Sequence, residues 1–279
     1  GVDTLPEIPQ DTTDRNRTSP LAFTGNKFEF RMLGSSQSIA SPNVVLNTIM
    51  AEELCQFADI LEKADDFQSA LQTLIRDTFA AHQRIIFNGN GYDDAWVQEA
   101  ARRGLANLRD TVDCMPAYID RKNIDLFTRH AVLTETEMRA RYEIHLENYC
   151  KVTTIEAKTL LDMVQRGILP AVSRYTDQLA VAVFHKKADS RLPISVKMEE
   201  TTLLRLSELS EKLFDTCEAL TAALSKAPAA DSGIDAARWY RTNISTRTQQ
   251  AGELISQLEA LMPADVWPFP TYADILFSV

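Results

Sequence analysis

Apolar residues recur at helical spacing along much of the chain, and this periodicity constrains the fold more than any other feature of the sequence. It is clearest in residues 196–226 and 234–262, which are separated by a break rich in proline, glycine and aspartate. An apolar residue at every third or fourth position forms a stripe on one helix face, and that face must be buried. Two such helices with a short connection form an antiparallel hairpin. The stripe therefore predicts an intramolecular core more strongly than a partner-binding face.

Most of the remaining chain also has helical patterns bounded by capping residues or by turn formers. Pro170 lies inside the longest of these patterns, so we expect it to kink that helix or to divide it in two. The last residues, 267–279, are rich in proline and aromatic residues and predict an extended tail held on the bundle by Trp267, Phe269 and Tyr272. The other helices are expected over residues 41–63, 66–87, 93–109, 110–119, 123–131 and 134–188.

Composition excludes several classes of function. The formal net charge of −10 argues against nucleic acid and anionic membranes as partners. No apolar run approaches the roughly 20 residues that a membrane span requires. The four cysteines are scattered and contain no C-x-x-C pair, a pattern typical of reduced thiols in a cytoplasmic protein. We therefore expect a cytoplasmic protein.

One segment differs from the helical remainder. Residues 27–33 alternate between polar and apolar side chains, which is the pattern of a half-buried strand. On its polar face, Glu29 lies between the cations Lys27 and Arg31. A carboxylate beside guanidinium groups suits a divalent metal next to a bound phosphate or carboxylate. The alternative is a surface strand that carries a ladder of salt bridges, and the pattern alone does not exclude it.

The sequence around this strand resembles the glutamine synthetase family, and specifically its type III branch. The resemblance rests first on the run DRNRTSPLAFTGNKFEFRMLGSSQSIASPNVVLNT, residues 14–48. It extends to LTETEMRARYEIHLENYCKVTTIEAKTLLDM and to the closing WPFPTYADIL, so that it spans nearly the whole chain. Members of the family make glutamine from glutamate, ammonia and ATP through γ-glutamyl phosphate, with Mg²⁺ or Mn²⁺ ions at the phosphates.

The resemblance implies a role for each residue that matches a family motif. Glu29 matches the metal-binding glutamate of the E-x-R strand. Arg31 matches the arginine of that motif, which stabilises the transferred phosphoryl group or binds glutamate. Arg15 and Arg17 match arginines that contact the ATP phosphates. They are separated by one residue only, so either could contact either phosphate.

The resemblance also implies what the chain lacks. The family's Glu-x-Glu strand, further metal-binding glutamates, nucleotide-side histidine and N-terminal domain have no counterpart among these 279 residues. We therefore expect a C-terminal portion of the enzyme that is inactive alone and binds neither ATP nor metal tightly. Its strand would be unpaired and exposed, disordered, or paired with another copy.

The predicted fold is mainly α: an antiparallel helical bundle following a short strand-bearing remnant of the glutamine synthetase catalytic fold. Residues 1–52 would belong to the catalytic domain, and residues 53–279 would form a helical C-terminal extension. The parent enzyme is expected to be a homo-oligomeric ring. The competing hypothesis is a stand-alone helical module for oligomerisation or protein interaction, without catalysis.

Overall fold

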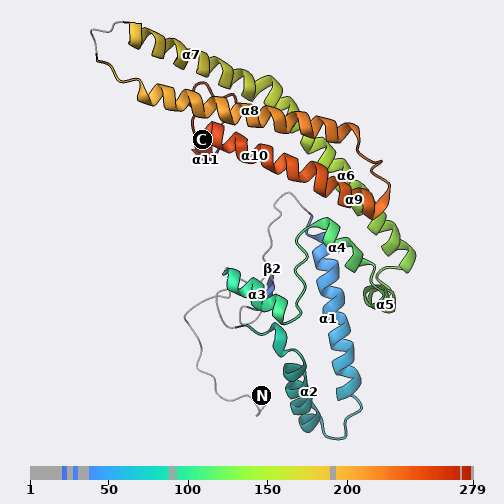
Figure 1. Ribbon diagram of the computed structural model, residues 1–279. Coiled ribbons are helices and arrows are strands. Elements are labelled where there is room, and N and C mark those ends of the chain that lie inside the picture. The colour runs from blue at the N-terminus through green and yellow to red at the C-terminus, as the bar shows by residue number, and fades with distance from the viewer. Residues whose placement is uncertain are drawn as a thin grey trace. The chain divides into compact units, whose positions relative to one another are not determined.

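The computed structural model describes residues 21–23, 28–30, 38–87, 91, 93–188, 193–270 and 272–277. These residues are predominantly helical, as predicted, and Figure 1 shows the order of the elements along the chain. The chain divides into two compact units, each treated separately below. The first comprises residues 1–110 and 117–138, and the second comprises residues 111–116 and 139–279.

The first unit contains a strand pair and a set of mostly short helices around one long helix, α1. The two strands form an antiparallel sheet. The boundary predicted at residue 52 falls inside α1, which runs without interruption. The elements are β1 (Leu21–Phe23), β2 (Phe28–Phe30), α1 (Ala40–Leu61), α2 (Phe67–Ala81), η1 (Gln83–Ile85), α3 (Asp94–Arg102) and α5 (Arg121–Arg129).

Two of these helices end earlier than the sequence pattern predicts. Helix α2 stops at Ala81 and is followed by a single turn of 3₁₀ helix. Helix α3 stops at Arg102 because Gly104 adopts a left-handed conformation with φ of 71°. The amides of Gly104 and Leu105 donate to carbonyls of the last turn, which is the hydrogen-bond pattern of a glycine-terminated helix.

The core of the first unit is small and is formed by α5 and by residues of the adjoining helices. Ile124, Phe127 and Met138 are its fully buried members. Val45 of α1 packs against this core, so burial of apolar surface holds α1 in place. Tyr118, Ile119 and Leu133 complete the cluster.

The second unit is a bundle of long helices. Helices α7 and α8 form an antiparallel hairpin, and α10 returns along α8, as Figure 1 shows. The hairpin predicted for residues 196–262 is thus present, formed by α8 with the helical run from α9 to α10. The elements are α6 (Glu135–Met163), η2 (Val164–Ile168), α7 (Leu169–Ala188), α8 (Lys197–Ser225), α9 (Gly233–Tyr240), η3 (Arg241–Ser245), α10 (Thr246–Glu259) and α11 (Tyr272–Phe277), with α4 (Thr111–Tyr118) divided between the units.

The core of the second unit follows the predicted stripe of α8. Five of its residues, Leu206, Leu209, Leu213, Cys217 and Leu220, are buried. The two ends of the stripe, residues 203 and 224, are half-buried. The expectation of an intramolecular core is therefore confirmed. Other helices contribute Leu146, Cys150, Val164, Ile168, Ile244 and Leu258, each at most 1% exposed.

The predicted long helix is divided near Pro170, as expected. Residues Val164–Ile168 form one turn of π-helix between α6 and α7, and the amide of Leu169 donates to the carbonyl of Val164, five residues earlier. Because proline has no amide hydrogen, the α-helical hydrogen bond to residue 166 cannot form. A π-turn next to a proline accommodates that loss within a continuous helical path.

The tail differs in part from the prediction. Trp267 is buried, and Phe269 lies against Gly167, so the two side chains hold the tail on the bundle as expected. The tail is not extended throughout, because residues Tyr272–Phe277 form the short helix α11. The side chain of Tyr272, the third predicted anchor, lies outside the described part of the chain.

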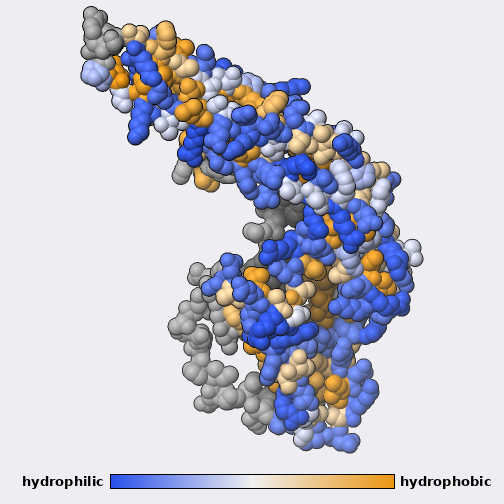
Figure 2. Space-filling model, viewed as in Figure 1, coloured by the Kyte–Doolittle hydropathy of each residue, from blue (hydrophilic) through white to orange (hydrophobic). Residues whose placement is uncertain are grey.

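Apolar side chains also reach the surface of the second unit. Figure 2 shows them on the α7–α8 hairpin, where Phe184, Met198 and Leu204 are each about 70% exposed (72%, 71% and 71%). Among the described residues, no helix combines the length and the hydropathy needed to cross a membrane.

Candidate functional site

The strand that carries the predicted metal ligand is present. Glu29 occupies the centre of β2 (Phe28–Phe30) and is half-buried. Residue 27 and residues 31–33, the remainder of the predicted strand, lie outside the described residues. Three residues of strand are enough to fix the direction of the backbone at Glu29, and therefore the side of the sheet on which its carboxylate lies.

Strand β2 is not the unpaired strand that the sequence led us to expect. It pairs with β1 of the same chain, with Leu21 opposite Phe30, Ala22 opposite Glu29 and Phe23 opposite Phe28. The expectation of an orphan strand was wrong because it overlooked β1, whose three residues are too few to show an alternating pattern. The pairing satisfies backbone hydrogen bonds that an isolated strand would leave to solvent.

The three predicted arginines cannot be placed. Arg15, Arg17 and Arg31 all lie outside the described residues. Their roles remain predictions from the resemblance.

The described residues do not by themselves form a metal site. Within the described ranges there is no group of three or more His, Cys, Asp or Glu side chains that could hold a metal ion. Mg²⁺ requires an octahedral set of oxygen ligands, usually with several waters, and Glu29 alone supplies a single carboxylate. Among the described residues, strand β2 thus offers one carboxylate, which is too few to hold the ion.

A cluster of charged side chains fixes helix α1, which follows the strand in sequence, to helix α5. Glu52 of α1 forms an ion pair with Arg129, the last residue of α5. Its second carboxylate oxygen lies 2.7 Å from Nε2 of His130. The Glu52 and His130 side chains are largely buried, with 12% and 15% exposed. We call these three residues the Glu52 cluster.

The environment of Glu52 favours its ionised form. Gln56 donates a hydrogen bond to the carboxylate, His130 contributes a second, and Arg129 adds a positive charge. Together these interactions lower the pKa of Glu52, although burial opposes them. No local pattern in the sequence indicated this cluster, because Glu52 is 77 residues from Arg129 and 78 residues from His130.

A second cluster closes the connection between α2 and α3. The rings of Phe87 and Trp96 stack with centroids 4.0 Å apart, and the Arg103 guanidinium lies within 6 Å of both centroids. Arg103 also donates to the carbonyl of Ile86 at 2.9 Å. Glu99 pairs with Arg102 and Arg103, and these contacts lower its pKa to about 2. This arrangement is structural, because its polar atoms already bond to one another.

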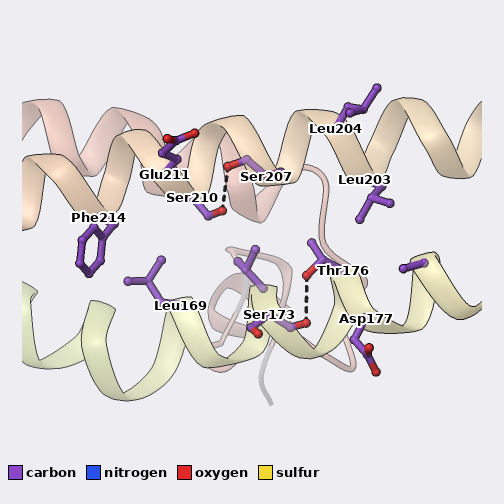
Figure 3. Close-up of a pocket in the computed structure, with 12 residues that line it drawn as sticks. Leu169, Ser173, Thr176, Asp177, Leu203, Leu204, Ser207, Ser210, Glu211 and Phe214 are labelled. Atoms are coloured by element: carbon purple, nitrogen blue, oxygen red, sulfur yellow. Dashed lines mark hydrogen bonds between the residues drawn. The ribbon is translucent and has the colours of Figure 1, made fainter.

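A groove of the second unit lies between α7 and α8, with a volume of about 880 Å³ (Figure 3). Leu169 and Phe214 point into the space between the helices, whereas Asp177 and Glu211 point away from it. Thr176 and Ser210 donate to backbone carbonyls one turn earlier, of residues 173 and 207. The inner surface of the groove is thus mainly apolar, and it offers no convergent set of acids, bases or nucleophiles.

Comparison with known proteins extends the resemblance noted in the sequence. The sequence model described as "Glutamine synthetase C-terminal domain" matches residues 70–187. A glutamine synthetase of Butyrivibrio fibrisolvens is 34% identical over 97% of this chain. A type-3 glutamine synthetase of Dictyostelium discoideum is 36% identical over 99% of the chain, and a glutamine synthetase of Bacteroides fragilis (strain YCH46) is 30% identical over 100%.

The match is complete along this chain but partial along its relatives. The chain spans 39%, 38% and 39% of the lengths of those three proteins, or about two fifths. Strand β2 with Glu29 lies outside residues 70–187, which match the C-terminal domain. It lies within the alignments with the three relatives, which cover at least 97% of this chain. The chain therefore belongs to the glutamine synthetase family, as a portion that carries the family's C-terminal domain and has a type III enzyme among its relatives.

Proposed function

We propose that this chain is the part of an ATP-dependent glutamate–ammonia ligase that adds the last strand to the active site and carries a helical extension. The observation that supports this is the similarity over at least 97% of the chain to three glutamine synthetases, which includes the strand of Glu29. In this proposal the complete enzyme converts glutamate, ammonia and ATP to glutamine, ADP and phosphate in the cytoplasm, as a ring of identical subunits.

Within that enzyme, Glu29 supplies one carboxylate ligand to Mg²⁺ or Mn²⁺, while Arg15 and Arg17 bind the ATP phosphates. Arg31 stabilises the transferred phosphoryl group or binds glutamate. This division suits phosphoryl transfer, which depends on positioned charge more than on a protein nucleophile. We assign residues 1–52 to the catalytic domain and residues 53–279 to the extension.

The first test is the activity of the isolated chain. With glutamate, hydroxylamine, ATP and Mg²⁺, the 279-residue chain should form no γ-glutamyl hydroxamate, since one carboxylate cannot assemble the metal site. Metal-dependent turnover by the purified chain would contradict this proposal.

The second test places the chain in a complete enzyme. A chimera is made in which this chain replaces the matching portion of the Dictyostelium type-3 relative. The chimera should form the hydroxamate, and Glu29→Gln should reduce kcat about 100-fold, a loss typical of removing one transition-state electrostatic contact. Glu53→Gln, an exposed residue of α1, is the matched control and should leave kcat unchanged.

The alternative function is a helical module for assembly, which the exposed apolar side chains of the α7–α8 hairpin favour. It predicts that the isolated chain self-associates in sedimentation experiments. It also predicts that Glu29→Gln and Glu53→Gln have equal effects in an active chimera, which would remove the catalytic role of Glu29.

A further inference from the structure

A second hollow of the second unit lies beneath the tail. It has a volume of about 630 Å³, within the range of small-molecule sites in proteins. Its walls come from α6, η2, α10 and the tail. We call it the tail cleft, and its lining residues include Leu160, Ile168, Ile255, Trp267, Phe269 and Ile275.

One polar atom in the tail cleft has no partner. Of the described residues, Thr248 alone has a buried side-chain oxygen or nitrogen without a hydrogen bond. Other helical threonines, among them Thr154, Thr216 and Thr242, donate to the carbonyl four residues earlier. Thr248, three residues after the π-helical turn η3, makes no such bond. A hydroxyl that is buried without a partner is unfavourable, and a ligand atom could relieve that cost.

The charged side chains that line the tail cleft are acidic. Among the described residues that line it, Glu156 and Glu259 are acidic and none is lysine or arginine. An anionic ligand would therefore meet repulsion, whereas a cation would meet attraction at the acidic edge. The apolar walls require that the rest of the ligand be hydrocarbon or aromatic.

We propose that the tail cleft binds a small cationic amphiphile, with its apolar body against Ile255 and Trp267. Its protonated amine lies near Glu156 and donates a hydrogen bond to Thr248. The α7–α8 groove offers no such feature, since Thr176 and Ser210 already bond to backbone carbonyls. The tail cleft belongs to the second unit, and this proposal does not depend on the function proposed above.

The test uses Trp267 as the reporter, because its buried ring lines the cleft. In the chain with Trp96→Phe and Trp239→Phe, titration with decylammonium below its micelle concentration should change the fluorescence saturably. Decanol should bind more weakly, and decanoate should bind most weakly. Equal affinity for all three probes, or no saturable change, would overturn the proposal.

Variants separate the contributions to binding. Thr248→Val should weaken decylammonium binding about fivefold, in proportion to one hydrogen bond. It should not lower the melting temperature, because the hydroxyl forms no bond in the free chain. Glu259→Gln combined with Glu156→Gln should weaken decylammonium but not decanol. If Thr248→Val destabilises the chain and leaves binding unchanged, the hydroxyl is not part of a ligand site.

A blocking variant identifies the occupant. Ile255→Trp should fill the cleft and abolish binding, whereas Ile144→Trp, at an exposed position of the same unit outside the cleft, should bind normally. Sedimentation gives the competing outcome. If the parent chain is a dimer that Ile255→Trp converts to a monomer, the cleft is occupied by a second copy and the proposal is overturned.

Discussion

At the scale of single residues, the ion pairs of this chain differ in how much water surrounds them. Lys186 and Glu199 pair where α7 ends and α8 begins, and only 8% of the Glu199 side chain is exposed. Lys187 and Glu200 form a neighbouring pair that is about half exposed (55% and 45%). A pair shielded from water is screened less by solvent and by salt, so its loss has a larger effect.

We predict that Glu199→Gln lowers the melting temperature at pH 7 more than Glu200→Gln does. The hydrogen bond from Lys186 lowers the pKa of Glu199 from its ordinary value of 4.5. Its ionised form therefore stabilises the folded chain above pH 4.5, and this stabilisation is lost as the pH falls through the lowered pKa. The difference between the parent chain and Glu199→Gln, followed by circular dichroism, should shrink as the solution is acidified below pH 4.5. If both forms are still folded at pH 2, a difference in melting temperature that stays constant down to that pH would contradict this prediction.

The cysteines give a second prediction at this scale. Cys55 and Cys114 are exposed, whereas Cys150 and Cys217 are buried, and burial raises the pKa of the Cys217 thiol to about 11. Because the thiolate is the reactive form, the native chain at pH 8 should release two equivalents of thionitrobenzoate quickly from Ellman's reagent. The denatured chain should release four. Rapid reaction of Cys217 in the native chain, detected by peptide mapping, would show that its environment is more open than the structure indicates.

Residue roles were the least predictable feature from the sequence. The metal-binding role of Glu29 stays a prediction that rests on its match to a family motif, because alternation alone favoured a salt-bridge ladder. The Glu52 cluster was missed entirely, because Glu52 and His130 meet only after α1 and α5 pack together. Thr248 was also missed, because the lack of a partner for its hydroxyl can be seen only in the folded chain.

At the scale of elements, the sequence predicted which helices exist better than it predicted where they end. The periodicity of α8 correctly gave its buried face, because a helix of this length repeats the apolar stripe many times. The end of α3 at Arg102 was missed by seven residues, although Gly104 is the residue type that stops a helix. Strand β1 was missed because pairing with β2, and not its own composition, makes it a strand.

Two glycines test this account of helix ends. The left-handed φ of Gly104 disfavours any residue with a Cβ, although no atom lies within 4 Å of the Cβ position. Gly104→Ala should therefore reduce the free energy of unfolding by about 1 kcal/mol. Gly252 lies within α10, also with open space around it, and Gly252→Ala should increase the same quantity by a similar amount. Urea unfolding measures both, and equal signs for the two substitutions would contradict the assignment of Gly104 as the helix terminator.

At the scale of the whole molecule, the chain has two compact units, and each has a buried core of its own. The core of the first contains Ile124, and that of the second contains Ile244. The sequence did not reveal this division, because the apolar periodicity continues through α6 and α4, which both have residues in the two units. The boundary at residue 52 was inferred from the resemblance, and it separates the part assigned to the catalytic domain from the helical extension. It therefore does not have to coincide with the division into compact units.

Matched substitutions show whether the two cores are energetically independent. Ile124→Val and Ile244→Val each remove one methylene group from a fully buried side chain, with 2% and 0% exposed. Each should reduce the free energy of unfolding by about 0.5–1.5 kcal/mol. Because the two residues belong to different cores, the double variant should equal the sum of the single variants within about 0.5 kcal/mol. Ile144→Val, at an exposed position, should change stability little and serves as the control. A larger coupling energy in this double-mutant cycle would mean that the two residues interact, which would contradict their assignment to separate cores.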